Sequence, residues 1–328
     1  MPLPKVLLIA LGGTITMTRG ASGTIAPTLT AADLVHAVPG IAAIADIEAV
    51  SPLTVPGASL SIDDVLAVAA LADDHLARGA AGVVVIQGTD TIEETAFLLD
   101  LAVRRDRPVV VTGAMRGAQA PGADGPANVL AATLVGASPA AVGLGTLVVL
   151  NDEIHAARFV QKSHTSLPSA FASPAAGPLG HVIEGAPRLR VQPAERIRPT
   201  LQPRPGDAPV ALIRMSLGDD GRLLREVPAL GYRGVVIEGM GAGHVPAPIA
   251  PIVSDLVQSL AVVLASRVHT GPTFTSTYGF AGSETDLLRR GAVAAGDLSG
   301  LKARLLLSLL LRGNADRDAI ARAFAAYR

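Results

Sequence analysis

The feature that most constrains the fold of this chain is a repeated alternation of short apolar runs with longer segments rich in alanine and leucine. The runs hold many β-branched residues and no polar face, which is typical of strands buried on both sides of a sheet. They are residues 6–10, 83–87, 109–112 and 147–150. The segments with polar residues at helical spacing are 31–38, 62–77, 92–104 and 127–137. This alternation predicts a parallel sheet with helices on both faces.

A rise in proline content divides the chain. Nine of the 24 prolines fall between Pro168 and Pro209, and the stretch 185–209 has no apolar periodicity, as in a linker. A second alternating pattern follows, with strands expected at 210–215, 234–238 and 261–266 and helices near 247–260 and 301–327. We therefore predict an α/β protein of two domains. These are a larger N-terminal catalytic domain (1–187) with a mainly parallel sheet sandwiched by helices, a linker (188–209) and a smaller C-terminal α/β domain (210–328).

Charge and composition exclude several classes of protein. The 27 basic and 28 acidic residues leave a net charge of −1 without a block of like charge, which argues against a nucleic-acid partner or electrostatic membrane binding. The chain has no cysteine and therefore no disulfide, thiol nucleophile or thiolate metal site. Its seven histidines do not pair at helical spacing. We expect no metal and no cofactor.

Two segments bear on localisation. The N-terminus lacks the basic start and the long apolar run of a signal peptide, which predicts a cytoplasmic protein. Residues 130–150 carry no charge over 21 positions, a length that could cross a bilayer. Because they also contain Pro139 and three glycines, we interpret them as a buried helix, a turn and a buried strand, and expect no membrane span.

Glycine-rich turns follow the first two predicted strands, where open parallel sheets bind their ligands. Gly12-Gly13-Thr14 follows the first strand, and Gly88-Thr89-Asp90 follows the second. Neither turn is a dinucleotide fingerprint or a phosphate-binding loop. A hydroxyl beside a carboxylate can orient a ligand or a water molecule, but each turn taken alone is also compatible with an ordinary connection between strand and helix.

Two further features stand out by spacing and by rarity. Thr91 and Glu94 have the spacing of a capping box, which predicts a structural role at the start of a helix. Lys162 is one of only three lysines among the 27 basic residues and lies in a polar loop. Lysine, unlike arginine, can lose its proton. Thr89, Asp90 and Lys162 can therefore supply a hydroxyl, a base and an orienting group, while a solvated loop lysine is the alternative.

A series of segments, in the same order along the chain, resembles the signature segments of the bacterial L-asparaginase family. The clearest is Gly88–Ala96, which reads Gly-Thr-Asp-Thr-Ile-Glu-Glu-Thr-Ala without a change from the family pattern. The other matching segments are Leu11–Ile15, Thr112–Arg116, Ala123–Asn128, Asn151-Asp152 with Lys162, and Gly239–Gly243. The likeness extends over most of the chain.

The resemblance implies hydrolysis of the side-chain amide of L-asparagine to L-aspartate and ammonia, without a cofactor. It makes Thr14 the first candidate nucleophile, and Thr89, Asp90 and Lys162 the second catalytic group. In this scheme a neutral Lys162, held by Asp90, takes a proton from Thr89. Either Thr14 forms an acyl-enzyme or Thr89 activates a water molecule, and the sequence leaves both routes open.

The resemblance also implies residues that bind the substrate. They are Ser59, Gly88, Ala114 and Glu284. Backbone N–H groups around 88–90 and 114–115 are expected to stabilise the oxyanion. In the family, the glutamate that matches Glu284 enters the site from a neighbouring subunit, which implies a homo-oligomer, a tetramer built of intimate dimers. The alternative reading of Glu284 is a charge at the start of a helix.

Three positions depart from the family pattern. Leu11 replaces a supporting threonine, and His244 stands where the family often has asparagine. The loop 16–28 is long and contains glycine, so we expect it to act as a lid. Many family members have a tyrosine on this loop that contacts the nucleophile, but this chain has none there. We predict that a lid hydroxyl from Thr16, Thr18, Ser22 or Thr24 replaces it, or that closure brings in another group.

Three other functions compete with an asparaginase. A glutaminase-asparaginase differs only by one substrate methylene, which a pocket discriminates weakly. A subunit of a tRNA-dependent amidotransferase would carry a further N-terminal domain and need a nucleic-acid partner. An amino-acid sensor on the same fold would have no use for two hydroxyls and a lysine at Thr14, Thr89 and Lys162.

Overall fold

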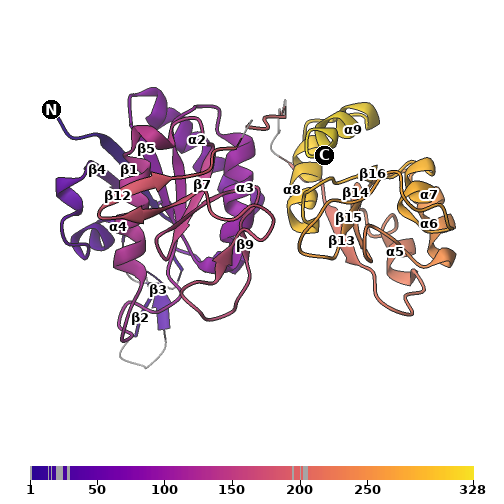
Figure 1. Ribbon diagram of the computed structural model, residues 1–328, viewed down its shortest axis with the longest axis horizontal. Helices are drawn as coiled ribbons and strands as arrows, with labels where there is room; N and C mark the ends of the chain where they lie inside the picture. Colours follow the sequence, from indigo (N-terminus) through magenta and orange to yellow (C-terminus); the bar gives the residue numbers. More distant parts are fainter. Residues whose placement is uncertain are drawn as a thin grey trace. The chain divides into compact units, whose positions relative to one another are not determined.

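The computed structural model describes residues 2–13, 15, 17–19, 25–27, 30–193, 196–199, 201 and 206–328. They form two compact units, each with its own sheet (Figure 1). Unit 1 is Met1–Arg196 and unit 2 is Ile197–Arg328. Each unit is an α/β sandwich, so the predicted fold class is confirmed.

Among the described residues, eight strands of unit 1 form one sheet that is mainly parallel. In spatial order they are β12 (Ala186–Leu189), β11 (Gly180–Ile183), β8 (Glu153–Ala156), β7 (Thr146–Leu150), β6 (Val109–Thr112), β5 (Gly82–Ile86), β1 (Lys5–Ala10) and β4 (Asp46–Val50). The strands from β7 to β4 pair in parallel, and β8, β11 and β12 extend the sheet antiparallel. The apolar runs of the sequence are the central strands, buried on both faces.

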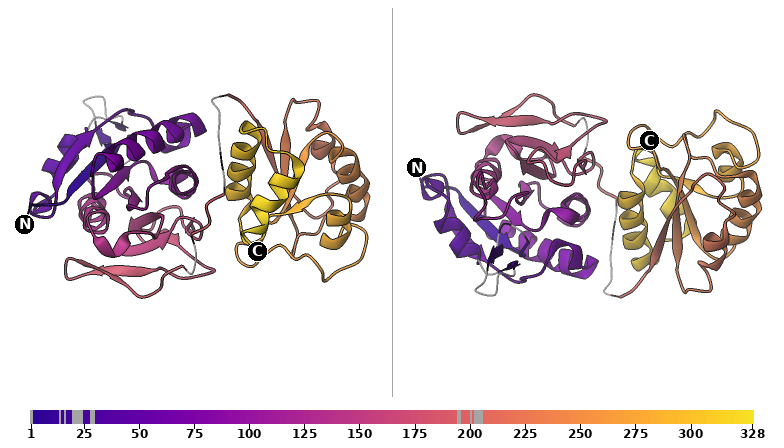
Figure 2. Two further views of the ribbon diagram at one scale, coloured as in Figure 1. Left: turned by 90° about the horizontal axis from the view of Figure 1, so that it is seen from above. Right: turned by 90° about the horizontal axis from the view of Figure 1, so that it is seen from below.

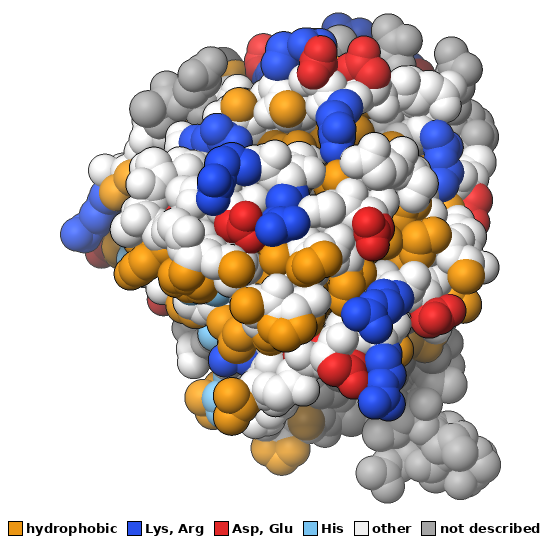
Figure 3. Space-filling model, turned by 90° about the vertical axis from the view of Figure 1, so that its right-hand side faces the viewer, with side chains coloured by type: hydrophobic (Ala, Val, Ile, Leu, Met, Phe, Trp, Pro, Cys, Tyr) orange, Lys and Arg blue, Asp and Glu red, His pale blue; other side chains and the backbone are white. Residues whose placement is uncertain are grey.

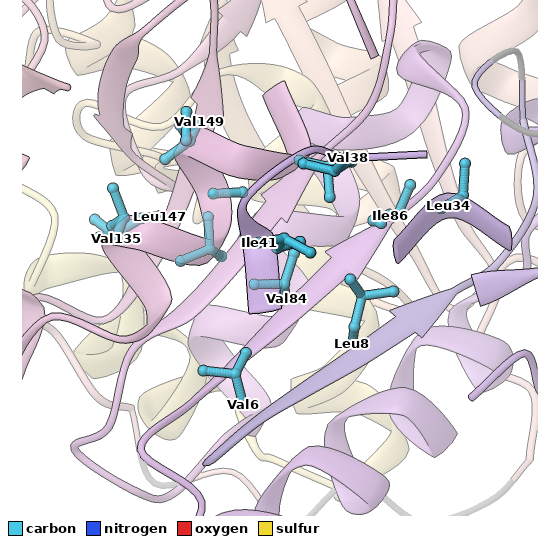
Figure 4. Packing of buried hydrophobic residues seen from close by; sticks show 14 of the residues in the cluster. Val6, Leu8, Leu34, Val38, Ile41, Val84, Ile86, Val135, Leu147 and Val149 are labelled. Carbon is cyan, nitrogen blue, oxygen red and sulfur yellow. The ribbon is translucent and has the colours of Figure 1, made fainter. Parts of the chain in front are cut away.

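Helices cover both faces of this sheet (Figure 2). On one face α1 (Ala31–His36) and α4 (Gly125–Gly136) pack on alternate strand residues, with Val6 and Leu8 of β1 beside Val84 and Ile86 of β5 (Figure 4). The helices α2 (Ile62–Ala77) and α3 (Ile92–Ala102) pack against each other and against the other face. Because successive strand residues point to opposite faces, a fully apolar strand supplies both cores.

Capping explains where the second helix begins. Ser61 precedes α2, its hydroxyl accepts the backbone N–H of Asp64, and the Asp64 carboxylate accepts the N–H of Ser61. The hydrogen bond from the Ser61 hydroxyl, followed by the one from its backbone, holds the pKa of Asp64 below its usual value. This capping box satisfies backbone donors that the first helical turn leaves open, and the observed bounds of α2 match the predicted segment 62–77.

Short elements complete unit 1. Two small antiparallel sheets are formed by β2 (Met17–Arg19) with β3 (Ile25–Pro27) and by β9 (Gln161–Lys162) with β10 (Phe171–Ala172). The 3₁₀ turns are η2 (Ile41–Ala43), η3 (Gly57–Ser59), η4 (Thr89–Thr91) and η5 (Pro139–Ala141). The uncharged segment 130–150 divides into the end of α4, η5 and β7, as predicted. No helix of the described residues is long and apolar enough to cross a membrane.

Two stretches expected to be irregular contain strands. Residues 186–189, read as non-periodic linker, form β12, and residues 151–169, read as a loop, contain β8 and β9. β12 is an edge strand in which Pro187 is tolerated, and its half-exposed side chains give no apolar run. Strands of two to four residues are too short to show a periodicity in the sequence.

Unit 2 is built on a parallel sheet of β13 (Val210–Arg214), β14 (Gly234–Gly239), β15 (Ala261–Ser266) and β16 (Val293–Ala294). One face packs on α5 (Arg222–Glu226), η6 (Ala247–Ile249), α6 (Ala250–Leu256) and α7 (Glu284–Arg289). The last helices are α8 (Gly300–Arg312), which packs on β13 and β14, and α9 (Arg317–Ala325). The single helical region expected at 301–327 is divided there, because Asn314 adopts φ +56 and ends the first helix.

Candidate active site

Three turns of unit 1 meet at the carboxyl ends of β1 and β5. The two strands are parallel neighbours, so the turns that follow them emerge side by side. A methyl group on Gly13 would lie 2.1 Å from the backbone nitrogen of Gly88, and one on Gly57 would lie 2.7 Å from the Gly88 carbonyl oxygen. Gly13 also has φ +92. Only glycine allows this approach, which brings the first two predicted turns and η3 into contact.

The residues of the second predicted catalytic group, Thr89, Asp90 and Lys162, lie together at the carboxyl end of β5. The Lys162 Nζ lies 2.9 Å from the Thr89 Oγ1 and 2.8 Å from an Asp90 carboxylate oxygen. Thr89 is buried, Lys162 is mostly buried, and the side chain of Asp90 is 66% exposed. One amine therefore touches a shielded hydroxyl and a carboxylate that is open to a ligand.

Lys162 reaches this place from a strand and not from a flexible loop. It is the second residue of β9, opposite Phe171 of β10. Its backbone N–H donates to the carboxylate of Glu93, in the first turn of α3, at 3.1 Å. The alternative of a solvated loop lysine is therefore wrong, because both ends of the residue are held.

The predicted capping box at Thr91 is absent. Thr91 directly precedes α3, but its side chain makes no hydrogen bond to the start of that helix. Its hydroxyl instead donates to the Gly57 carbonyl at 2.9 Å and accepts from the Gln87 amide at 3.1 Å. The hydroxyl joins the turn after β5 to η3, a role that sequence spacing did not indicate.

The turn after β6 closes the site on another side. Gly113 packs against Thr89 and Gln87, so the buried Ala114 follows next to the turn that carries Thr89 and Asp90. The N–H of Met115, one of the expected oxyanion donors, is already bound to the Asp124 carboxylate at 2.9 Å, which corrects that expectation. Asp124 belongs to the matching segment Ala123–Asn128, which anchors this turn.

Asn128 fixes the same turn from α4. Its side-chain amide donates to the Gly113 carbonyl at 2.9 Å, and its oxygen accepts the backbone N–H of Asn151 at 2.9 Å. Asn128 and Asn151 both belong to segments that match the family pattern, but the pattern gave neither of them a role. Gln87, Glu93 and Asn128 were all missed as supporting residues, and the signal that could have found Asn128 was the motif itself.

The remaining predicted residues of unit 1 lie nearby or outside the described part. Ser59 is exposed at the end of η3, two residues from the Gly57 carbonyl that holds Thr91. Thr14 lies outside the described residues, as do residues 16, 20–24 and 28 of the predicted lid. Leu11 is buried at the end of β1, where its backbone N–H donates to Ile86.

Glu284 belongs to unit 2, where it is fully buried at the first position of α7. Its carboxylate accepts the backbone N–H groups of Thr277 and Tyr278 at 2.9 and 2.6 Å and contacts the His244 Nε2 at 3.2 Å. Burial opposes ionisation, but these donors together hold the pKa of Glu284 below its usual value. His244 also packs edge-on against the rings of Tyr278 and Phe280, so its departure from the family pattern serves a cluster around Glu284.

Neither a metal-binding cluster nor the cavity of unit 2 offers an alternative site among the described residues. The described residues contain no cluster of three or more His, Cys, Asp or Glu side chains that could hold a metal ion. Unit 2 has a cavity of about 380 Å³ at the amino ends of β14, β15 and β16, lined in part by Tyr232, Arg233 and Arg317. Parallel sheets bind ligands at the carboxyl ends of their strands, and the cavity contains none of the predicted site residues.

Known families match both units. Residues 5–195 match the family model described as "Asparaginase, N-terminal", and residues 209–324 match "Glutaminase/Asparaginase C-terminal domain". The chain belongs to the asparaginase family. The resemblance expected from the signature segments is therefore confirmed over nearly the whole sequence.

Relatives of this asparaginase-family chain match it over nearly their full length. It is 35% identical to "Probable L-asparaginase" of Deinococcus radiodurans over 98% of this chain and 97% of that protein. It is 34% identical to "Glutaminase-asparaginase" of Acinetobacter glutaminasificans over 98% of both chains. A crystal structure of "Probable Cytoplasmic L-asparaginase from Campylobacter jejuni" matches its fold with a TM-score of 0.85 and 30% identity, covering 98% of this chain and 99% of that one.

Proposed function

We propose that this member of the asparaginase family is an amidohydrolase that converts L-asparagine to L-aspartate and ammonia. The observation that carries the proposal is the contact of the Lys162 amine with both Thr89 and Asp90. A buried hydroxyl beside an amine at 2.9 Å has the geometry of a nucleophile or water activator and its base. Relatives matched over nearly their full length disfavour a sensor or an amidotransferase subunit.

In the proposed reaction the neutral amine of Lys162 takes a proton from the Thr89 hydroxyl. The Asp90 carboxylate, 2.8 Å from the same nitrogen, stabilises the ammonium that forms. The attacking oxygen belongs to Thr14, through an acyl-enzyme, or to a water molecule activated by Thr89. Mass spectrometry of the enzyme quenched during turnover distinguishes the two routes, because only the first forms a covalent ester on Thr14.

The substrate is held by groups that match both ends of an amino acid. Ser59 and the backbone around Gly88 are proposed to bind the α-carboxylate, and the exposed Asp90 the α-ammonium. Ala114, on the turn packed against Thr89, lines the side-chain amide. Preference for asparagine over glutamine depends on one methylene, worth about 1–3 kcal/mol.

We propose that Glu284 completes the active site of a second copy of the chain, in a homotetramer of intimate dimers. Its carboxylate is ionised and held rigidly by unit 2. Tyr278 and Phe280, whose rings pack on His244 beside it, are 44% and 51% exposed. Figure 3 shows hydrophobic side chains between scattered charges on a face of unit 2, as at subunit interfaces.

Mixing two inactive variants tests this sharing of sites. Thr89→Val removes one subunit's hydroxyl and Glu284→Ala the other's carboxylate. When the two are unfolded and refolded together, mixed dimers hold one complete site, and about a quarter of wild-type activity is expected to return. Activity that stays at the level of the separate variants refutes a shared site, and light scattering gives the number of subunits.

The decisive test of the function is ammonia release from L-asparagine and from L-glutamine by wild type and by Thr89→Val. Release by wild type that disappears in the variant supports the amidase with Thr89 in the site. No release from either amide by folded wild type refutes it. We further propose a cytoplasmic location, because the similar structure from Campylobacter jejuni is that of a probable cytoplasmic L-asparaginase. Cell fractionation of the source organism tests it.

A further inference from the structure

The hairpin that carries Lys162 is too small to hold the lysine by itself. β9 and β10 have two residues each, and residues 163–167 between them are exposed. An isolated pair of short strands is not stable in water. The hydrogen bond from the Lys162 N–H to Glu93 fixes the β9 side. On the β10 side the Phe171 side chain, opposite Lys162, is buried, and Ser173 follows the strand.

A chain of three hydrogen-bonded side chains, Glu153, His155 and Ser173, anchors the β10 side to the main sheet; Glu153 is 32% exposed and the other two are buried. The His155 Nδ1 lies 3.0 Å from the Ser173 Oγ, and its Nε2 lies 3.1 Å from a Glu153 oxygen. His155 is 1% and Ser173 4% exposed. Ser173 directly follows β10, whereas the other two residues belong to β8.

β8 is a firm base for this anchor. It is paired on one side with β7 and on the other with β11, inside the main sheet. His155 therefore ties the free end of the hairpin to a strand that cannot move without breaking the sheet. None of the three side chains contacts Thr89 or Asp90, and the proposed reaction does not use them.

We propose that His155 is a positioning residue for Lys162: it holds the β9–β10 hairpin so that the lysine amine stays in reach of Thr89. This inference rests on the proposed function of Lys162. Displacement of a catalytic group by about 1 Å can cost two orders of magnitude in rate. The substrate-binding turns lie on other elements, so loss of the anchor lowers kcat and leaves KM nearly unchanged.

The anchor works with a neutral imidazole. Nε2–H then donates to Glu153 while Nδ1 accepts the hydroxyl proton of Ser173. The groups that face the ring are Glu153 on β8, His181 on β11 and Ser173 after β10. Burial lowers the pKa of His155 and His181 lowers it further, against the opposing effect of Glu153. When the ring is protonated, both nitrogens are donors. The hydrogen bond with Ser173 is then reversed, and the hydroxyl has to rotate so that its oxygen accepts from Nδ1.

Three variants and one control test the proposal. Ser173→Ala and His155→Leu are expected to lower kcat for ammonia release about tenfold or more, with KM within about twofold of wild type. His155→Gln restores part of kcat, because an amide can also donate to Glu153 and accept from Ser173. Ser166→Ala, at an exposed serine of the same hairpin, matches wild type. Should His155→Leu not fold, Ser173→Ala carries the test.

A second readout does not depend on activity. The chain has three lysines, so labelling of each amine by a succinimidyl ester can be followed by mass spectrometry. Lys162 is expected to react faster in Ser173→Ala than in wild type, with the exposed Lys5 as internal reference. Equal kcat and equal Lys162 labelling in Ser173→Ala and wild type overturn the inference. If wild type releases no ammonia, the proposed function fails, and labelling alone decides whether the anchor exists.

The pH profile separates positioning from mere stability. Wild-type kcat is expected to fall on acidification below the usual histidine pKa of about 6.5, as His155 takes up a proton. Protonation of the base Lys162 lowers kcat on acidification in both proteins, so the readout is the difference between their profiles. His155→Gln cannot titrate at this position, so its kcat should fall less steeply than that of wild type, while thermal unfolding shows it folded across the range. Profiles that coincide after scaling refute the role of His155.

Discussion

Removal of the Thr91 hydroxyl tests which role this residue has. It either links the turn after β5 to η3 by hydrogen bonds, which we call the joint, or caps the start of α3. Thr91→Val keeps the shape of the side chain but breaks the bonds to the Gly57 carbonyl at 2.9 Å and from the Gln87 amide at 3.1 Å. Both partners are buried. The Gln87 amide nitrogen keeps its bond to the Gly88 carbonyl, and its oxygen has no partner within the described part of the chain.

The size of the effect follows from these partners. The Gly57 carbonyl keeps the Leu60 N–H and the Gln87 amide keeps the Gly88 carbonyl, so neither group is left unpaired. Each lost hydrogen bond contributes about 1 kcal/mol, so we expect a loss of about 2 kcal/mol in the free energy of unfolding. Because η3 carries Ser59, the KM for L-asparagine should rise together with this loss.

Urea unfolding and steady-state ammonia release measure the two consequences. Thr91→Ser keeps the hydroxyl and should recover most of both quantities, and Thr165→Val makes the same change at an exposed threonine. A loss near 1 kcal/mol with KM unchanged is what a simple helix cap gives and would refute the joint.

Three further outcomes are expected. Lys162→Arg replaces the proposed neutral amine by a permanently charged guanidinium that cannot accept a proton, so ammonia release should fall by about 10² or more while Lys5→Arg changes nothing; normal turnover would exclude Lys162 as the base. Gly57→Ala places a methyl group 2.7 Å from the Gly88 oxygen and should destabilise the protein by about 1–3 kcal/mol, whereas Gly117→Ala meets open space. The pKa of Glu284 is lowered in the folded protein, so its ionised carboxylate should stabilise wild type relative to Glu284→Gln. This difference in stability should be complete above the ordinary carboxyl pKa and decline as the pH falls through the lowered pKa. A difference in thermal unfolding between the two proteins that does not change with pH would contradict this.

The central strands were predictable because burial on both faces leaves a continuous apolar run. Residues 109–112 and 261–266 coincide with β6 and β15. β12 and β9 were missed for the opposite reason. They are short, partly exposed strands at edges, and hydrogen bonds to distant neighbours define them more than their own residue types.

In the candidate site, too, some residues could be recognised from local sequence and others depend on distant neighbours. Thr89 and Asp90 are adjacent in the sequence, and their position after a buried strand placed them at the ligand-binding edge of the sheet. The contact with Lys162 spans 73 residues and depends on a hairpin that no local pattern revealed. The rarity of lysine and the resemblance to a family both singled out Lys162, and the structure brings its amine to Thr89 and Asp90.

The fold class and the set of reactive groups could be read from the sequence, because periodic burial and short motifs are local properties of the chain. The partner that each polar group takes depends on the tertiary structure. Thr91 could have capped its own helix, but the approach of Gly57 to Gly88 brings a carbonyl within 2.9 Å of its hydroxyl. Met115 was lost as an oxyanion donor for the same reason, since the Asp124 carboxylate reaches its N–H. Hydrogen bonds are chosen by competition among the groups that packing brings together, and packing is not local.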